Sequence, residues 1–90
     1  MNLFKSKKAR AQEIVVDLMG IVVELMVEDQ FNVSAPEISA YLRNKKTSDI
    51  SNAIDGCDSL LAQATAPTGM INPEVIVKVR VALGWELGRR

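Results

Sequence analysis

Residues 34–61 read SAPEISAYLRNKKTSDISNAIDGCDSLL, and most of the expected fold follows from this stretch. It begins with Ser34-Ala35-Pro36-Glu37, which has the form of a capping box. In this motif the Ser34 hydroxyl accepts a hydrogen bond from an amide of the first turn, and Glu37 reaches back to the Ser34 amide. Pro36 suits the first turn, where a helix does not need the missing donor. The pattern predicts a helix that begins at Ser34 and ends near Arg43-Asn44.

A further helix is predicted after a short basic turn, Asn44-Lys45-Lys46. Thr47 or Ser48 is placed to cap this helix. The negative charge of Asp49 interacts favourably with the positive N-terminal end of the helix dipole. Apolar residues then recur at helical spacing: Ile50, Ala53, Ile54, Cys57, Leu60 and Leu61. We interpret Cys57 as a small core residue in this stripe. Residues 65–69, TAPTG, are predicted to form a loop.

Upstream, residues 9–29 predict a long helix with more apolar surface than one face provides. Two neighbouring stripes recur with steps of three and four residues: Ile14, Leu18, Ile21 and Leu25, and Val15, Met19, Val22 and Met26. Val16, Val23 and Val27 widen this surface. Two interpretations stay open, a dimer interface and a central helix covered by its own domain. For the dimer, the expected interface residues are Val15, Leu18, Met19, Val22, Leu25 and Met26.

The C-terminal segment fits two structures. Asn72-Pro73-Glu74 has the form of a helix start. The following valines, however, occupy every second position from Val75 to Val81, which is the period of a strand. On a strand, Lys78 and Arg80 would project together from one face. We favour a strand for residues 73–83 and keep the helix as the alternative.

Residue types limit the chemistry that the chain can perform. The sequence has no histidine, so the usual general base and the commonest zinc ligand are missing. Cys57 has no histidine to activate it as a nucleophile. The five glycines do not have the spacing of a phosphate-binding motif. We therefore expect a protein that is not an enzyme, with no catalytic residue, no metal and no cofactor.

Length and apolar patterning suggest one domain outside the membrane. The 90 residues are enough for a single core, and we expect a basic tail at residues 1–8 and one domain at residues 9–90. The longest apolar stretch, residues 14–27, is too short to span a bilayer. A single cysteine and no recognisable signal peptide predict a cytoplasmic protein.

The order of the expected elements resembles a winged helix-turn-helix domain. Glu37–Leu42 is similar to the first helix of that motif and Thr47–Ile54 to its recognition helix. The apolar anchors that match the motif are Ile38, Leu42, Ile50 and Ile54. Small domains of this kind are similar to regulators found in phages and plasmids. The resemblance implies an α+β, mainly α, fold in which three helices precede a C-terminal β segment.

The same resemblance implies a regulator of transcription or replication that binds double-stranded DNA, in this case as a dimer. Lysines in the turn and basic residues on the wing would contact phosphates. Polar side chains of the recognition helix would reach base edges, and Asn52 can pair with adenine. The implied DNA-binding residues are Lys45, Lys46, Thr47, Ser48, Ser51, Asn52, Lys78 and Arg80.

Two other hypotheses remain open, and the charge balance favours the first of them. The net charge is zero and the pI is about 6.2, which is low for a nucleic-acid binder. The expected recognition helix also has no lysine or arginine. The second hypothesis is therefore a protein-interaction module of similar fold that docks a partner through the first helix or Trp85. The third is a membrane-surface protein that uses Leu3, Phe4 and the lysines after them as an anchor.

Overall fold

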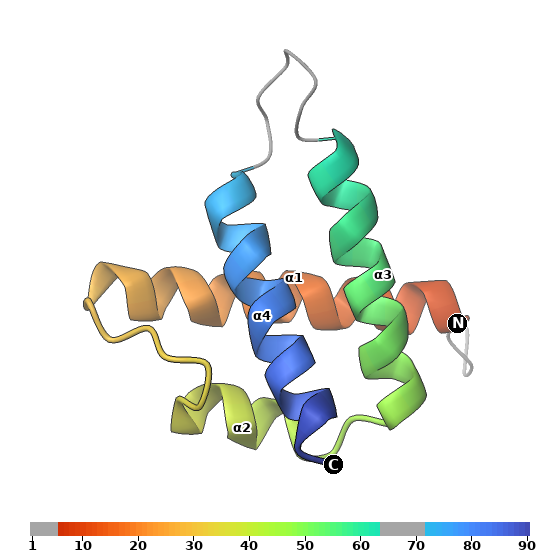
Figure 1. Cartoon of the computed structure of the whole chain (residues 1–90), viewed down its shortest axis with the longest axis horizontal. Coiled ribbons are helices and arrows are strands. Elements are labelled where there is room, and N and C mark those ends of the chain that lie inside the picture. Colours follow the sequence, from red (N-terminus) through yellow and green to blue (C-terminus); the bar gives the residue numbers. More distant parts are fainter. Residues whose placement is uncertain (1–5, 64–71) are drawn as a thin grey trace, which may run out of the picture.

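The computed structural model describes residues 6–63 and 72–90, which form four α-helices and no strand (Figure 1). The helices are α1 (Lys7–Val27), α2 (Pro36–Leu42), α3 (Thr47–Gln63) and α4 (Pro73–Gly88). α3 and α4 lie side by side in opposite directions, and both cross α1, which forms a second layer. The short α2 packs against α1 and α4. The described part of the chain is therefore all-α, and the expected α+β winged fold is wrong.

The core lies where the α3–α4 pair crosses α1. Its largest fully buried side chains come from all four helices: Leu18, Val22, Ile38, Leu42, Ile50, Ile76, Val79 and Leu83. Cys57 is also fully buried, which confirms its predicted place in the core. Burial of one large aliphatic side chain stabilises a fold by roughly 1.5–3 kcal/mol. The aromatic residues contribute less, since Phe31 and Tyr41 are only partly buried and Trp85 is 49% exposed.

α1 begins earlier than predicted. The Ser6 hydroxyl accepts a hydrogen bond from the Ala9 amide at 3.1 Å, so Lys7 and Lys8 belong to the first helical turn rather than to a tail. Residues 1–5, which include Leu3 and Phe4 of the proposed membrane anchor, lie outside the described residues. No helix in the described part of the chain has the length and apolar character needed to cross a bilayer.

α1 ends at a left-handed residue. Asp29 has a φ of 55°, and the Gln30 amide donates to the Leu25 carbonyl at 2.7 Å. A left-handed residue just after the last turn is a common way to satisfy the final carbonyls of a helix. Aspartate adopts this conformation at less cost than most residues. The helix therefore stops two residues before the predicted end at Asp29.

The C-terminal segment is a helix, and the strand favoured for residues 73–83 is wrong. The Asn72 side chain accepts a hydrogen bond from the Glu74 amide at 3.0 Å, and Pro73 is the first helical residue. Both are ordinary features of a helix start. They also agree with the alternative that the sequence left open.

The alternating valines fit a helix because they separate into two pairs. Val75 and Val79 lie four residues apart and are buried, whereas Val77 and Val81 are nearly half exposed. A helix that buries one side and leaves apolar residues on the other therefore shows the same alternation as a strand. Without a β segment, the described residues contain no wing.

α2 begins one residue later than the capping box predicts. Ala35 occupies the N-cap position and makes no side-chain hydrogen bond to the helix. The Ser34 amide and hydroxyl both donate to the Asn32 side-chain oxygen, at 2.9 and 2.8 Å. Asn32 thus forms a local turn that competes with the predicted cap. Ser34 does not begin the helix. The loop predicted at residues 65–69 lies outside the described residues.

These two helix starts give a stability prediction. Asn72→Ala removes the side chain that caps α4 and is expected to lower the free energy of unfolding by about 1 kcal/mol. Ser34→Ala serves as the matched control, because its hydroxyl caps no helix, and it is expected to cost only about half as much or less. Chemical denaturation of both variants measures the difference. A larger destabilisation by Ser34→Ala than by Asn72→Ala would contradict the observed helix starts.

Candidate functional site

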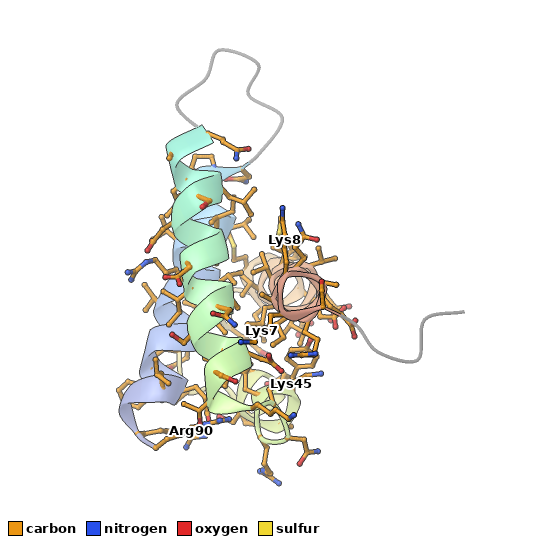
Figure 2. All side chains as sticks on the ribbon, turned by 90° about the vertical axis from the view of Figure 1, so that its right-hand side faces the viewer. Lys7, Lys8, Lys45 and Arg90 are labelled. Atoms are coloured by element: carbon orange, nitrogen blue, oxygen red, sulfur yellow. The ribbon has the colours of Figure 1, made fainter. Side chains whose placement is uncertain are left out.

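The α2–α3 turn, where the sequence placed phosphate contacts, is held by the C-terminal end of α4. The Arg90 guanidinium donates to the Leu42 carbonyl at 2.8 Å, to the Lys45 carbonyl at 2.9 Å and to the Thr47 hydroxyl at 3.0 Å. Figure 2 shows Arg90 and Lys45 at the same end of the molecule. The final carbonyls of a helix have no partner within the helix, and Arg90 supplies one for α2. The hydroxyl of Thr47 is already engaged by this contact.

Glu86 positions Arg90 from within α4. Its carboxylate is buried and accepts hydrogen bonds from Arg90 at 2.9 Å and from Arg89 at 2.8 and 3.0 Å. Burial alone would raise the pKa of Glu86, but the hydrogen bonds from Arg90 and Arg89 outweigh it and hold the pKa below its usual value. The charged form of Glu86 is therefore favoured in the folded protein.

The first turn of α3 is tied to α1. Asp49 is buried there, and both of its carboxylate oxygens accept from the Arg10 Nε at 3.2 Å. Asp49 therefore faces inward, toward α1, and is not available to a ligand at the outer face. Thr47 is the first residue of the helix rather than the cap that the sequence suggested.

Other predicted phosphate and base contacts are spread over several surfaces. The Lys45 amine lies 4.7 Å from the centre of the Tyr41 ring, and the Tyr41 hydroxyl donates to Asp17 at 2.6 Å. Lys46, Ser48 and Ser51 are exposed, whereas Asn52 is half-buried and faces α1. The structure therefore brings Lys45 to Ser51 to one end of the molecule and turns Asn52 to a different side.

Lys78 and Arg80 do not project together, and that expectation is wrong. Two residues apart on a helix point to nearly opposite sides. The Lys78 amine lies 3.8 Å from the Glu74 carboxylate and 5.2 Å from the centre of the Phe31 ring. Arg80 instead bonds to Asp58 on α3. Lys78 and Arg80 therefore lie on different sides of α4, and each already has an anionic partner.

α2 and α3 are not packed as a helix-turn-helix pair. α2 lies against α1 and α4 and makes no close backbone approach to α3 within the described residues. α3 exposes Asp55, which borders the side that faces α1, and Asp58, which is paired with Arg80 of α4. No lysine or arginine occurs in this helix. Negative charge on the expected recognition face would repel phosphate.

Four of the six residues predicted for a dimer interface belong to the core of the single chain. They are Val15, Leu18, Val22 and Leu25, all of which are buried. Met19 and Met26 are partly buried at the edge of the core. The residues that α1 exposes are instead Val16 at 65%, Val23 at 44% and Val27 at 82%. In the sequence these valines form extra apolar surface, but the predicted interface did not include them.

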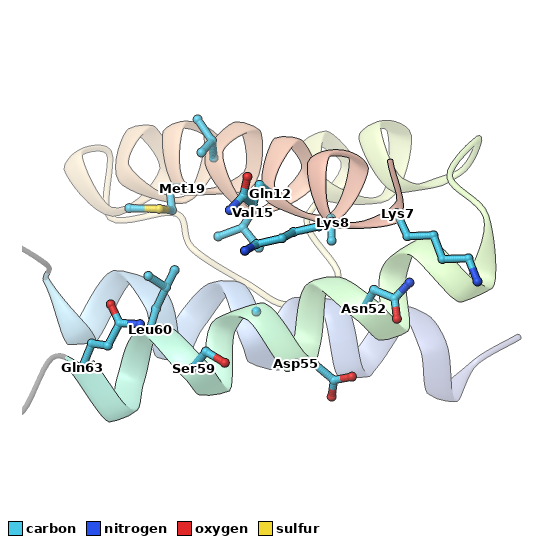
Figure 3. Close-up of a pocket in the computed structure, with 13 residues that line it drawn as sticks. Lys7, Lys8, Gln12, Val15, Met19, Asn52, Asp55, Ser59, Leu60 and Gln63 are labelled. Atoms are coloured by element: carbon cyan, nitrogen blue, oxygen red, sulfur yellow. The ribbon is translucent and has the colours of Figure 1, made fainter. Parts of the chain in front are cut away.

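A groove of about 850 Å³ runs between α1 and α3, next to this exposed surface (Figure 3). Its apolar lining includes Val15, Val16, Met19 and Leu60. Polar side chains surround these residues: Lys7, Lys8 and Gln12 on α1, and Asn52, Asp55, Ser59 and Gln63 on α3. Neither lysine has an ion-pair partner among the described residues. The groove is therefore an apolar channel whose edges carry the charges of Lys7 and Lys8 on α1 and of Asp55 on α3.

α4 also exposes apolar side chains. Val77, Val81 and Trp85 follow one another at steps of four residues and are 46%, 47% and 49% exposed. Arg80, on one edge of this face, is paired with Asp58. The described residues thus present one exposed apolar face on α1 and another on α4.

Two features of the described residues bear on their chemistry. These residues contain no group of three or more cysteine, aspartate or glutamate side chains placed to hold a metal ion. Burial, followed by the neighbouring Asp58, raises the pKa of the Cys57 thiol to about 11, which disfavours the thiolate. Comparison with models of known protein families, with curated proteins and with solved structures gives no match. The functional assignment therefore depends on the surfaces described above.

The Glu86–Arg90 contact predicts a pH-dependent stability. Because the folded pKa of Glu86 is lowered, its contribution is present above the usual pKa of 4.5 and is lost as pH falls through the folded value. Arg90→Ala is expected to lower the unfolding free energy by about 2 kcal/mol at neutral pH, the scale for hydrogen bonds to charged groups. For Glu86→Gln, the difference from wild type should shrink below about pH 4.5.

Chemical denaturation over a pH series measures both effects. Arg43→Ala is the control, because Arg43 is exposed in the same turn and makes no described side-chain bond. It should leave stability nearly unchanged. A Glu86→Gln difference that stays constant down to about pH 3 would show that ionisation of Glu86 does not stabilise the fold.

Proposed function

We propose that this protein is a protein-interaction module, without enzymatic activity, that binds through an exposed apolar helix face. One observation supports this most strongly. α1 buries Leu18 and Val22 completely on its inner side and still exposes Val16, Val23 and Val27 on its outer side. A helix that is apolar on both sides is usually covered on both sides. The described residues, 6–63 and 72–90, cover only the inner side.

The residues that were predicted to bind DNA give weaker support to DNA binding, because several of them already have partners within the chain. Thr47 is bonded to Arg90, Arg80 to Asp58, and Lys78 lies beside Glu74. Near the α2–α3 turn, the basic residues that remain to bind phosphate are Arg43, Lys45 and Lys46. The net charge of zero offers no general attraction to a polyanion. A partner with an apolar face of its own suits this surface better.

The location proposed for this module is the cytoplasm. The single cysteine is buried in the core and is therefore not placed to form a disulfide with another protein. A reducing compartment suits such a chain. The proposal does not require a cofactor, since the binding surface consists of aliphatic side chains and a groove.

Titration against duplex DNA distinguishes the module from a DNA-binding regulator. We expect weak binding that depends little on sequence, and an unchanged affinity when Lys45 and Lys46 are both replaced by alanine. Fluorescence anisotropy between about 50 and about 200 mM salt measures this, because phosphate contacts make affinity fall steeply over that range. Lys7→Ala combined with Lys8→Ala is the matched control at the other end of the chain.

The proposal would be overturned by tight, salt-dependent DNA binding that the Lys45 and Lys46 substitutions weaken. In that case the salt slope should flatten by about one unit for each lysine–phosphate interaction that the substitutions remove. Equal effects of the two lysine pairs would indicate nonspecific attraction only, and would leave the interaction module as the better account.

A further inference from the structure

We infer that the outer side of α1 pairs in antiparallel orientation with the same side of a second copy of this chain. This inference rests on the proposed function and names its partner. The surface consists of Val16, Met19, Val23 and Met26, which we call the α1 outer stripe. Val16 and Val23 are 65% and 44% exposed, and the two methionines are partly buried beside them.

The spacing of the α1 outer stripe is that of a coiled coil. Its residues follow one another at steps of three, four and three positions. Such steps keep side chains in line along a helix and let them fit between those of a second helix. Gln12 lies one further step of four toward the N-terminus, so the apolar stripe ends at a polar residue. The core-facing residues of α1 lie on the other side of the helix and are already covered.

The stripe is also complementary to itself. Its steps read the same in both directions, with a midpoint between Met19 and Val23, at the level of residue 21 along the helix axis. A twofold axis near that point places Val16 against the partner's Met26 and Met19 against the partner's Val23. Each contact then occurs twice, which gives a closed dimer rather than a chain of molecules.

Gly20 leaves room for the two helices to approach. It is exposed beside the centre of the stripe, and a β-carbon added there would meet no atom within 4 Å in the single chain. The glycine is therefore not required by packing inside the domain. Near a twofold axis the two Gly20 residues would lie close together, where the missing side chains allow backbone contact.

Charge favours the antiparallel orientation. Lys7 and Lys8 begin α1, whereas Glu24 and Glu28 lie at its other end, and none of them has a described ion-pair partner. Antiparallel helices place the basic end of each copy toward the acidic end of the other. Parallel helices would bring like charges together. Exposed charges of this kind set orientation more than affinity.

The groove between α1 and α3 gives the partner helix a second contact. It borders the stripe along Val16 and Met19, and its far side is α3 with Leu60. A helix laid along the stripe would cover the opening of the groove. The face of α4 lacks this geometry, because Val77, Val81 and Trp85 follow steps of four only, which wind around a helix.

Light scattering coupled to size-exclusion chromatography tests the inference on the full chain at micromolar concentration. We expect twice the chain mass of 9.9 kDa. Val23→Glu places an unpaired carboxylate against the partner's Met19 and is expected to weaken dimerisation at least about tenfold. Val81→Glu on α4 is the matched control, since Val81 is 47% exposed and Val23 is 44% exposed. If Val23→Glu lowers the midpoint of thermal unfolding, Val16→Glu repeats the test at a side chain that is 65% exposed.

Cysteine cross-linking then tests the orientation. Val16→Cys mixed with Met26→Cys should form a disulfide-linked dimer under mild oxidation, whereas Val16→Cys alone should not. The native Cys57 is buried and does not compete. Cross-linking of Val16→Cys to itself would show a parallel dimer and overturn the antiparallel arrangement.

Two outcomes would overturn the inference and leave the interaction module standing. One is a monomer at all concentrations tested, which would assign the exposed face to a different protein. The other is a dimer that Val81→Glu dissociates and Val23→Glu does not, which would move the interface to α4. Tight binding of DNA through Lys45 and Lys46 would instead remove the proposed function itself.

Discussion

The crossing of α1 over the α3–α4 pair is the contact on which the rest of the structure depends. Leu18 and Val22 are fully buried there, as are Ile76 and Val79 of α4. The ion pair between Arg10 and Asp49 fixes the same crossing from its polar edge. Since α3 and α4 contact one side of α1, the outer valines of α1 remain exposed within the part of the chain that the structure describes. The core and the proposed interface thus arise from the two sides of one helix.

Much of the helical architecture could be predicted from local signals. The stripe that contains Leu18 identified α1, and the spacing from Ile50 to Cys57 identified α3. The C-terminal helix was not predicted because four alternating valines fit a strand. The helix start at Asn72 was the signal in favour of a helix. The start of α2 was shifted by one residue because Asn32 takes both Ser34 donors. That competition depends on loop geometry rather than on a sequence motif.

The surfaces were harder to predict than the helices. Two apolar stripes on α1 satisfied the same periodicity, and only the docking of α3 and α4 shows that Val15 and Val22 face inward while Val16 and Val23 face outward. Lys78 and Arg80 were grouped because of an expected strand, and the helix separates them. The 16–19–23–26 spacing was present in the sequence and was the signal for an outer stripe. This spacing was hard to single out because Met19 and Met26 also belong to the neighbouring stripe of Val15 and Val22.

The contact between Arg90 and the α2–α3 turn bears on how the domain assembles. α2 has seven residues, too few for a stable isolated helix. Its Leu42 carbonyl is bonded by a residue 48 positions further along, so this contact requires closure of a long loop. We therefore expect α2 to become ordered only after α4 has docked. By the same logic, we expect α2 to be the first element to detach in a native-state fluctuation, which would expose the buried side chains of Ile38 and Leu42 to water.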